Sequence, residues 1–249
     1  MYVIDIHNVR KEESEMKLGI MQPYFLPYIG YWQLMNQVDK YVVYDDVNYI
    51  KGGWINRNRI LVNDGVHYLN LQMIGASPNK LINEVGVNRD IRLVNRNLRL
   101  LENAYRRAPH FQEAYELMER IFSIDESNVA LYNMEHMKII CNYLGIETEL
   151  ILSSELEKRN ELKGQDKVLH ICELLKATEY YNAIGGQDLY SFEAFAERGI
   201  QLKFIKTNDI QYKQFGETFY PNLSILDVIM FNSREEVQRM LNEYTLVMI

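Results

Sequence analysis

The sequence has little cysteine and no long apolar run. Its 249 residues include two cysteines, Cys141 and Cys172, and both fall in patterns typical of apolar helix faces. We therefore expect two buried thiols and no disulfide. No stretch approaches the roughly 18 consecutive apolar residues that cross a bilayer. The first 15 residues lack the apolar core of a signal peptide, which predicts a cytoplasmic protein.

Positive charge and histidine are also scarce. Lys plus Arg total 27 against 34 Asp plus Glu, a formal net charge of −7. Because nucleic acids and anionic membranes attract positive fields, this balance argues against general binding to either. The five histidines show no zinc-ligand spacing, so we expect no metal centre built on His or Cys. Phosphate-loop, nucleophile-elbow and dinucleotide glycine motifs are absent as well, and the sequence leaves any cofactor open.

Aromatic residues are abundant, and tyrosine dominates them. The chain has 18 Tyr, 9 Phe and 2 Trp. A buried tyrosine needs a hydrogen-bond partner for its hydroxyl group. The composition is consistent with two interpretations: polar, aromatic-lined surfaces that suit sugar or base rings, and a tyrosine-rich core whose hydroxyl groups are satisfied.

The order of the elements predicts an α/β fold. Residues 18–21 and 40–45 are apolar runs typical of buried strands, and residues 28–37 between them carry helical spacing. This opening is a βαβ unit, whose strands should be parallel. Further along, the Asp-Gly pair at 64–65 marks a hairpin turn between two apolar runs.

Three helices are expected between about 90 and 145, and strands and helices alternate again from 148. We predict a mostly parallel, Rossmann-like sheet with a helical insertion around 90–145. Residues 16–249 are expected to form one α/β domain, preceded by an extension over residues 1–15.

The first candidate region is the loop that follows the first strand, from Gln22 to Tyr31. In open parallel sheets, ligands bind beyond the carboxyl ends of the strands. The free N–H groups of a helix that starts after Pro23 favour an anion, and Gly30 would allow close approach. The alternative is a rigid turn fixed by its prolines.

The second candidate region begins with Asp45 and Asp46 at the end of the next strand. Strand side chains alternate between faces, so one carboxylate should face the site and the other should cap the turn. The facing carboxylate could bind sugar hydroxyls, hold magnesium or act as a base. Lys51 follows, and Tyr49 and Trp54 offer flat faces for a ring. The alternative is a solvated turn.

The third candidate region is the polar run Asn56-Arg57-Asn58-Arg59. In an extended stretch the two arginines share one face, and with Lys51 they could hold a diphosphate. The alternative is surface charge on an edge strand.

Several motifs together resemble the WbqC-like protein family. They are the run from Met21 to Tyr31, Val42 to Asp46, Tyr49 to Lys51, Trp54 to Ile60, Lys163 to Asp166, Tyr181-Asn182, Gly185-Gly186, Leu189-Tyr190, Tyr212, Gln214 and Ser224 to Asp227. The resemblance covers roughly Met16 to Ile249. It implies a role in bacterial surface-polysaccharide (O-antigen) biosynthesis, with a nucleotide-linked amino sugar as substrate and transfer of an acyl or aminoacyl group to its amine. It also implies that Gly185, Gly186, Ser224 and Asp227 bind substrate.

In this hypothesis, each candidate region has a role. Asp45 or Asp46 would deprotonate or orient the amine, and Lys51, Arg57 and Arg59 would hold the diphosphate. Hydrogen bonds to the sugar or to a developing oxyanion would come from Gln22, Asn56 and Asn58. Pro23, Gly30, Tyr31, Tyr49 and Trp54 complete the expected substrate site. The acyl donor stays open.

A weaker similarity supports a different hypothesis. The start of the first helix is similar to the H-x-G-H site of nucleotidylyltransferases and class I aminoacyl-tRNA synthetases, but Tyr28 and Tyr31 replace both histidines, and no K-M-S-K-S-like lysine loop follows. A magnesium-dependent nucleotidyltransferase that uses Asp45 and Asp46 is therefore one alternative. The other is a non-catalytic module that binds a nucleotide sugar or a partner glycosyltransferase.

Overall fold

The computed structural model describes residues 15–63 and 65–248. Its centre is a six-stranded sheet in the order β10-β9-β8-β1-β2-β7. These strands are β1 (Lys17–Met21), β2 (Lys40–Val43), β7 (Glu149–Leu152), β8 (Glu179–Ala183), β9 (Gln201–Thr207) and β10 (Tyr244–Val247). All neighbouring strands pair in parallel except β10, which is antiparallel to β9. The predicted α/β fold with a mostly parallel sheet is confirmed.

Helices cover both faces of the sheet, which explains why the strands β1 and β2 are mostly buried apolar runs. On one face, Val42, Tyr180 and Phe204 pack with α5 (Gly164–Leu174) and α6 (Phe192–Ala196). Because strand side chains alternate, the adjacent residues Tyr41, Tyr181 and Ile205 belong to the opposite core. That larger core includes α1 (Ile29–Gln37), α7 (Ile225–Phe231) and α8 (Arg234–Met240).

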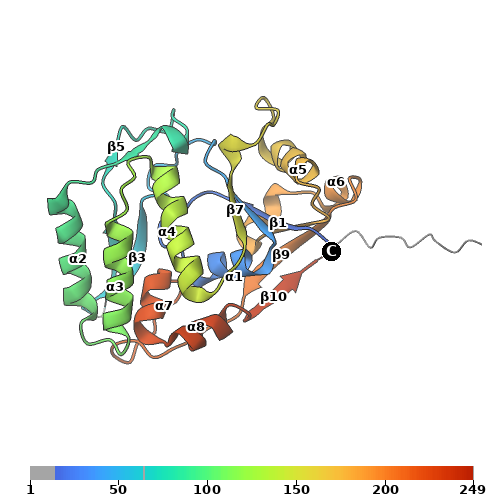
Figure 1. Cartoon of the computed structure of the whole chain (residues 1–249). Helices are drawn as coiled ribbons and strands as arrows, with labels where there is room; N and C mark the ends of the chain where they lie inside the picture. The colour runs from blue at the N-terminus through green and yellow to red at the C-terminus, as the bar shows by residue number, and fades with distance from the viewer. Residues whose placement is uncertain (1–14, 64, 249) are drawn as a thin grey trace, which may run out of the picture.

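The chain between β2 and β7 adds further elements to the larger core. It contains the hairpin of β3 (Arg57–Val62) and β4 (Gly65–Asn70), the short strands β5 (Met73–Ile74) and β6 (Gly86–Val87), and the helices α2 (Ile91–Tyr105), α3 (Phe111–Phe122) and α4 (Val129–Leu144). The three helices lie side by side at the end of the molecule opposite α5 and α6 (Figure 1). They fall within the predicted insertion.

The two cysteines are free and buried, as predicted. The predicted extension lies outside the described residues except for Glu15, and Asp64 of the predicted hairpin turn also lies outside them. No helix within residues 15–63 and 65–248 is long and apolar enough to cross a membrane.

The order of the strands reverses beside β1, and a ligand site is expected at this reversal. From β1 the chain moves through α1 to β2 and later to β7, whereas β8 returns to the other side of β1 and leads on to β9. Crevices for ligands form at such reversals, beyond the carboxyl ends of the two strands. Met21 and Ala183 end the two strands here.

Candidate functional site

A cavity of about 600 Å³ lies at this reversal, and we call it the switch-point cavity. It is lined by Ile20, Met21, Gln22, Tyr24, Pro27, Tyr28, Tyr44, Trp54, Asn58, Arg59, Asn182, Ala183, Gly185, Gly186, Leu189, Tyr190 and Asn222. Its size is that of a typical small-molecule site, and its aromatic walls with a few polar groups suit a ring-containing ligand. Asp, Glu, His and Lys are absent from this lining among the described residues.

Two polar atoms on residues of this lining have no hydrogen-bond partner in the described structure. One is the acceptor Oε1 of Gln22, and the other is the donor Nε of Arg59, and both atoms are buried. Arg59 is held in place, because its Nη2 donates to the carbonyl of Asn222 at 2.8 Å and its guanidinium lies 5.7 Å from the Trp54 ring centre. Buried polar groups without partners are costly, so the two residues favour a ligand that offers a donor to Gln22 and an acceptor to Arg59.

The loop between β1 and α1 is clamped by side chains from distant elements. Asn133 of α4 donates from Nδ2 to the carbonyl of Pro23 at 2.7 Å and to that of Ile55 at 2.8 Å. Asn58 donates to the carbonyl of Phe25 at 3.0 Å, and the Tyr31 hydroxyl donates to that of Gln22 at 2.5 Å. These side-chain donors therefore provide hydrogen bonds to backbone carbonyl groups that the buried loop removes from water.

The second half of the loop is held in the same way. The Ser224 hydroxyl donates to the carbonyl of Leu26 at 2.8 Å, and Trp32 Nε1 donates to that of Pro27 at 3.0 Å. Leu26 has a positive φ of 42°, which costs energy and persists only when neighbouring contacts hold it. The clamp fixes Gln22 and Tyr28 before any ligand arrives, which lowers the entropy cost of binding.

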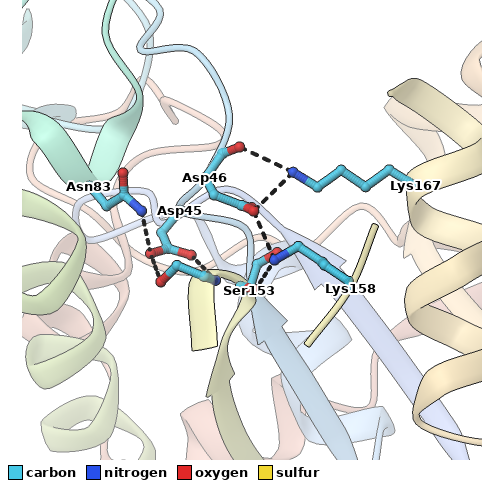
Figure 2. Close-up of polar contacts among 7 residues, drawn as sticks. Asp45, Asp46, Asn83, Ser153, Lys158 and Lys167 are labelled. Carbon is cyan, nitrogen blue, oxygen red and sulfur yellow. Dashed lines mark hydrogen bonds and ion pairs between the residues drawn. The ribbon is translucent and has the colours of Figure 1, made fainter. Parts of the chain in front are cut away.

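Asp45 and Asp46, at the end of β2, face different partners (Figure 2). Asp45 is buried and accepts hydrogen bonds from the Ser154 amide at 2.9 Å, the Ser154 hydroxyl at 2.6 Å and Asn83 Nδ2 at 3.2 Å. It thereby ties the chain after β7 to the end of β2. With its two oxygens already engaged, Asp45 is a positioning residue.

Asp46 forms ion pairs with two lysines through one oxygen. Its Oδ2 lies 2.9 Å from Lys158 Nζ and 3.0 Å from Lys167 Nζ. Burial alone would raise the pKa of Asp46, but the hydrogen bonds from the two lysines outweigh it and hold that pKa below its usual range. Asp46 is therefore ionised at neutral pH.

The carboxylates at the end of β2 do not fit a magnesium site. A magnesium ion takes oxygen ligands in octahedral geometry, but amide, hydroxyl and ammonium groups already occupy both oxygens of Asp45 and Oδ2 of Asp46, which leaves Asp46 Oδ1 alone without a partner. No group of three or more His, Cys, Asp or Glu placed to hold a metal ion occurs within residues 15–63 and 65–248.

Comparison with known proteins identifies the family. The model of the WbqC-like protein family matches residues 22–239. The chain belongs to the WbqC-like protein family. It is 30% identical over 220 residues to the uncharacterized protein Rv1507c of Mycobacterium tuberculosis strain H37Rv, a match that covers 87% of this chain and 93% of that protein. No solved structure matches it significantly.

In this WbqC-like protein, part of the predicted site comes together. Gln22, Trp54, Asn58, Arg59, Gly185 and Gly186 all line the switch-point cavity. Pro23, Tyr31 and Ser224 belong to the clamped loop or to its clamp, and so support the cavity without lining it.

Other predicted residues have structural partners outside the cavity lining. The Tyr49 hydroxyl donates to Asn56 Oδ1 at 2.9 Å, and Asn56 donates to the Leu71 carbonyl at 3.0 Å. Arg57 lies over the exposed Tyr68 ring at 4.4 Å on the hairpin, and Lys51 is exposed. None of these four candidates lines the cavity.

Gly30 and Asp227 also contribute to packing in the WbqC-like chain. A Cβ at Gly30 would lie 2.4 Å from the Thr207 hydroxyl and 2.5 Å from the Tyr28 ring, so glycine permits α1 to approach β9. Asp227 is fully buried and accepts hydrogen bonds from three groups: the hydroxyls of Tyr105 and Tyr212, each at 2.7 Å, and Gln214 Nε2 at 2.8 Å. Burial raises the pKa of Asp227, and the three hydrogen bonds, which act in the opposite direction, only partly offset this rise.

Two residues of the clamp, Asn133 and His136, were not predicted from the sequence. Both lie on the buried face of α4, three residues apart. A polar residue on an apolar helix face is a signal that sequence reasoning can use, because such a residue must find a buried partner. Here the partners are the Pro23 carbonyl and the Leu26 amide of the loop, and the Ile55 carbonyl that precedes β3.

His136 gives this WbqC-like protein an expected dependence on pH. Its Nε2 accepts a hydrogen bond from the Leu26 amide at 3.2 Å, and burial lowers its pKa to about 3. The unfolded ring protonates near 6.5, so between pH 6.5 and 3 only the unfolded state binds this proton. This contribution to stability is complete above pH 6.5 and falls as the pH drops.

From pH 7 to pH 5, we expect the free energy of unfolding of the wild-type protein to fall by about 2 kcal/mol more than that of a variant without an ionisable ring at position 136. The matched variant is His136→Gln, whose amide oxygen can still accept from Leu26. Urea unfolding at both pH values measures the difference. Equal losses in the two proteins would contradict the buried, neutral role of His136.

Proposed function

We propose that this WbqC-like protein transfers an acyl or aminoacyl group to the amine of a nucleotide-linked amino sugar, in the biosynthesis of a bacterial surface polysaccharide. The observation that carries the proposal is that Gln22 and Arg59 both line one aromatic cavity and that each has a buried polar atom without a partner, the acceptor Oε1 and the donor Nε. A nucleotide-linked sugar offers phosphate acceptors for the arginine and hydroxyl or amine donors for the glutamine. Its base and sugar rings suit the aromatic walls.

Each part of the cavity has a place in this proposal. Arg59 binds the diphosphate, since guanidinium groups form strong charge-assisted hydrogen bonds with phosphate oxygens. Trp54 supports a ring of the ligand next to Arg59. Gly185 and Gly186 present backbone without a side chain, and nothing lies within 4 Å of a Cβ built at Gly185.

The proposed reaction forms one bond and breaks one. The amine nitrogen of the sugar attacks the carbonyl carbon of an activated acyl donor, and a C–N bond forms. The bond between that carbon and the leaving group breaks, and the leaving group takes the electron pair. The nitrogen loses its extra proton to solvent. Asp46 does not line the switch-point cavity; kept ionised by Lys158 and Lys167, it holds their ammonium groups in place, and that of Lys167 lies 5.0 Å from the ring centre of the cavity residue Tyr44.

An assay with mass detection tests this function. The protein is incubated with amino sugars linked to uridine, thymidine or guanosine diphosphate, together with acyl-coenzyme A or aminoacyl-adenylate donors. We expect a product heavier by one acyl group. Asp46→Asn removes the charge that holds Lys158 and Lys167 in place, and is expected to lower kcat about 10-fold while KM for the sugar nucleotide changes little. Asp188→Asn, at an exposed position that contributes no side chain to the cavity, is the matched control.

A second candidate function is a non-catalytic module that binds nucleotide sugars. The cavity lining favours it in one respect, because the described lining contains no carboxylate or imidazole that could act as a base. Saturable binding of a sugar nucleotide without product under every donor would support this module. An unchanged kcat in Asp46→Asn would contradict the role given to that residue.

A further inference from the structure

A second cavity, of about 660 Å³, lies between the end of β2 and the start of α5. Its wall includes Tyr44, Asp46, Lys163, Gly164 and Lys167. Tyr44 also lines the switch-point cavity, so the two cavities share a wall residue. The first cavity contains the polar groups expected for a sugar nucleotide, and the second differs in being cationic.

Two lysines paired with the cavity residue Asp46 are buried to an unusual degree, and one of them, Lys167, lines the cavity itself. The side chains of Lys158 and Lys167 are 1% and 7% exposed, and both pair with Asp46 Oδ2. Among the described residues, Asp46 is the one carboxylate within ion-pair distance of either ammonium group. Two positive charges and one negative charge leave 2 − 1 = +1. Buried charge without compensation is costly, and lysine is rarely buried unless it is paired.

The ammonium groups also have unused donor capacity. Lys158 donates to the Ser153 carbonyl as well as to Asp46, and Lys167 donates to the Asp46 carbonyl at 3.2 Å as well as to its carboxylate (Figure 2). Each ammonium group carries three N–H donors, so each has one beyond these contacts. Lys167 also lies 5.0 Å from the Tyr44 ring centre, on the residue shared by the two cavities.

The neighbouring backbone adds to the positive potential. Gly164 begins α5 on the cavity wall, and no side chain caps that helix end. Lys163, at the N-cap position, also lines the cavity. Asp166, the acidic residue in the first turn, does not belong to the lining. Free N–H groups and the helix dipole at such an end favour an anion, in addition to the buried lysine charge.

We propose that the second cavity is a phosphate-binding site and that, in the reaction proposed above, it holds a phosphate group of the acyl donor. The identity of the bound group as a phosphate rests on the lysines and the cavity. Its assignment to the donor rests on the proposed function. Tyr44 would then stand between the acceptor in the first cavity and the donor in the second.

Thermal unfolding of the full chain with inorganic phosphate tests the site. Titration is carried out in a buffer without phosphate, against sodium chloride of matched ionic strength. We expect phosphate to raise Tm of the wild-type protein beyond the effect of chloride. Lys167→Met should weaken phosphate binding at least about 10-fold, the loss of one charged hydrogen bond. Lys176→Met, just beyond the other end of α5, makes the same charge change at an exposed position and should bind phosphate like the wild type.

The Lys167→Met variant is also expected to fold. It leaves Asp46 and Lys158 as a neutral pair, so Tm without phosphate should stay within about 2 °C of the wild-type value. A phosphate effect that persists in Lys167→Met would overturn the proposal, as would the absence of any effect beyond chloride in the wild type. Loss of the effect in Arg59→Met alone would also overturn it, because phosphate would then bind in the switch-point cavity.

Steady-state kinetics show whether the bound phosphate belongs to the acyl donor or to the sugar nucleotide. If it belongs to the donor, Lys167→Met raises KM for the acyl donor at least about 10-fold and leaves KM for the sugar nucleotide unchanged. A rise in KM for the sugar nucleotide instead would overturn the assignment to the donor. Phosphate binding that depends on Lys167 in a protein without transferase activity would confirm the site and contradict the proposed function, so the two failures are distinguishable.

Discussion

Replacing Asn133 with leucine is expected to lower the free energy of unfolding by about 3 kcal/mol. The fully buried Nδ2 of Asn133 donates to the carbonyls of Pro23 and Ile55, and leucine leaves both without this donor. An unsatisfied buried carbonyl costs about 1–3 kcal/mol. Because Pro23 follows Gln22 directly, the variant should also bind a sugar nucleotide less tightly. Urea unfolding measures the first effect and calorimetric titration the second.

The matched control is Asn142→Leu. Asn142 lies on the same helix but is exposed, so the same change there should alter stability by less than about 0.5 kcal/mol. A loss below about 1 kcal/mol for Asn133→Leu would mean that the loop keeps its conformation without this clamp.

Replacing Arg59 with methionine is expected to raise Kd for a nucleotide-linked sugar about 10- to 100-fold. The reason is the loss of one or two charge-assisted hydrogen bonds to phosphate, worth about 1.4–2.8 kcal/mol. The fold should tolerate the change, since the described side-chain contacts of Arg59 are one hydrogen bond to the Asn222 carbonyl and its position over Trp54. Isothermal titration calorimetry measures Kd in both proteins.

Arg96→Met controls for the charge change in that experiment. Arg96 is exposed on α2 and does not line the switch-point cavity. An equal rise in Kd for the two variants would indicate a general charge effect. An unchanged Kd in Arg59→Met would remove the arginine from the diphosphate site.

The framework of the fold could be predicted because it depends on local patterns. Apolar strands such as β1 and β2 lie between cores on both sides, and their sequences show it. The two prolines of the loop after β1 indicated a stiff connection, and the parallel βαβ order indicated the sheet edge at which ligands bind. That reasoning led to Gln22, whereas the aromatic and polar residues around the start of β3 led to Trp54, Asn58 and Arg59, and all four line the switch-point cavity.

The pairing of residues far apart in the chain could not be predicted from local patterns. Strand alternation predicted different roles for Asp45 and Asp46, but not that Asp46 has two lysine partners, one of which, Lys167, lies 121 residues further on. Arg57 and Arg59 share one side of β3. Arg57 nevertheless lies over the Tyr68 ring, and of the two arginines only Arg59 lines the cavity. Such details depend on how the hairpin and α5 pack against the sheet.

A crystal structure with a bound nucleotide-linked amino sugar is the most direct test of the central claim, that such a ligand occupies the switch-point cavity. The probe is the uridine, thymidine or guanosine diphosphate-linked sugar that gives the largest heat in calorimetry. The account predicts a phosphate oxygen within hydrogen-bond distance of Arg59 Nε, a hydroxyl or amine on Gln22 Oε1, and a ring against Trp54. Density for the ligand only outside this cavity, or none at saturating concentration, would contradict the account.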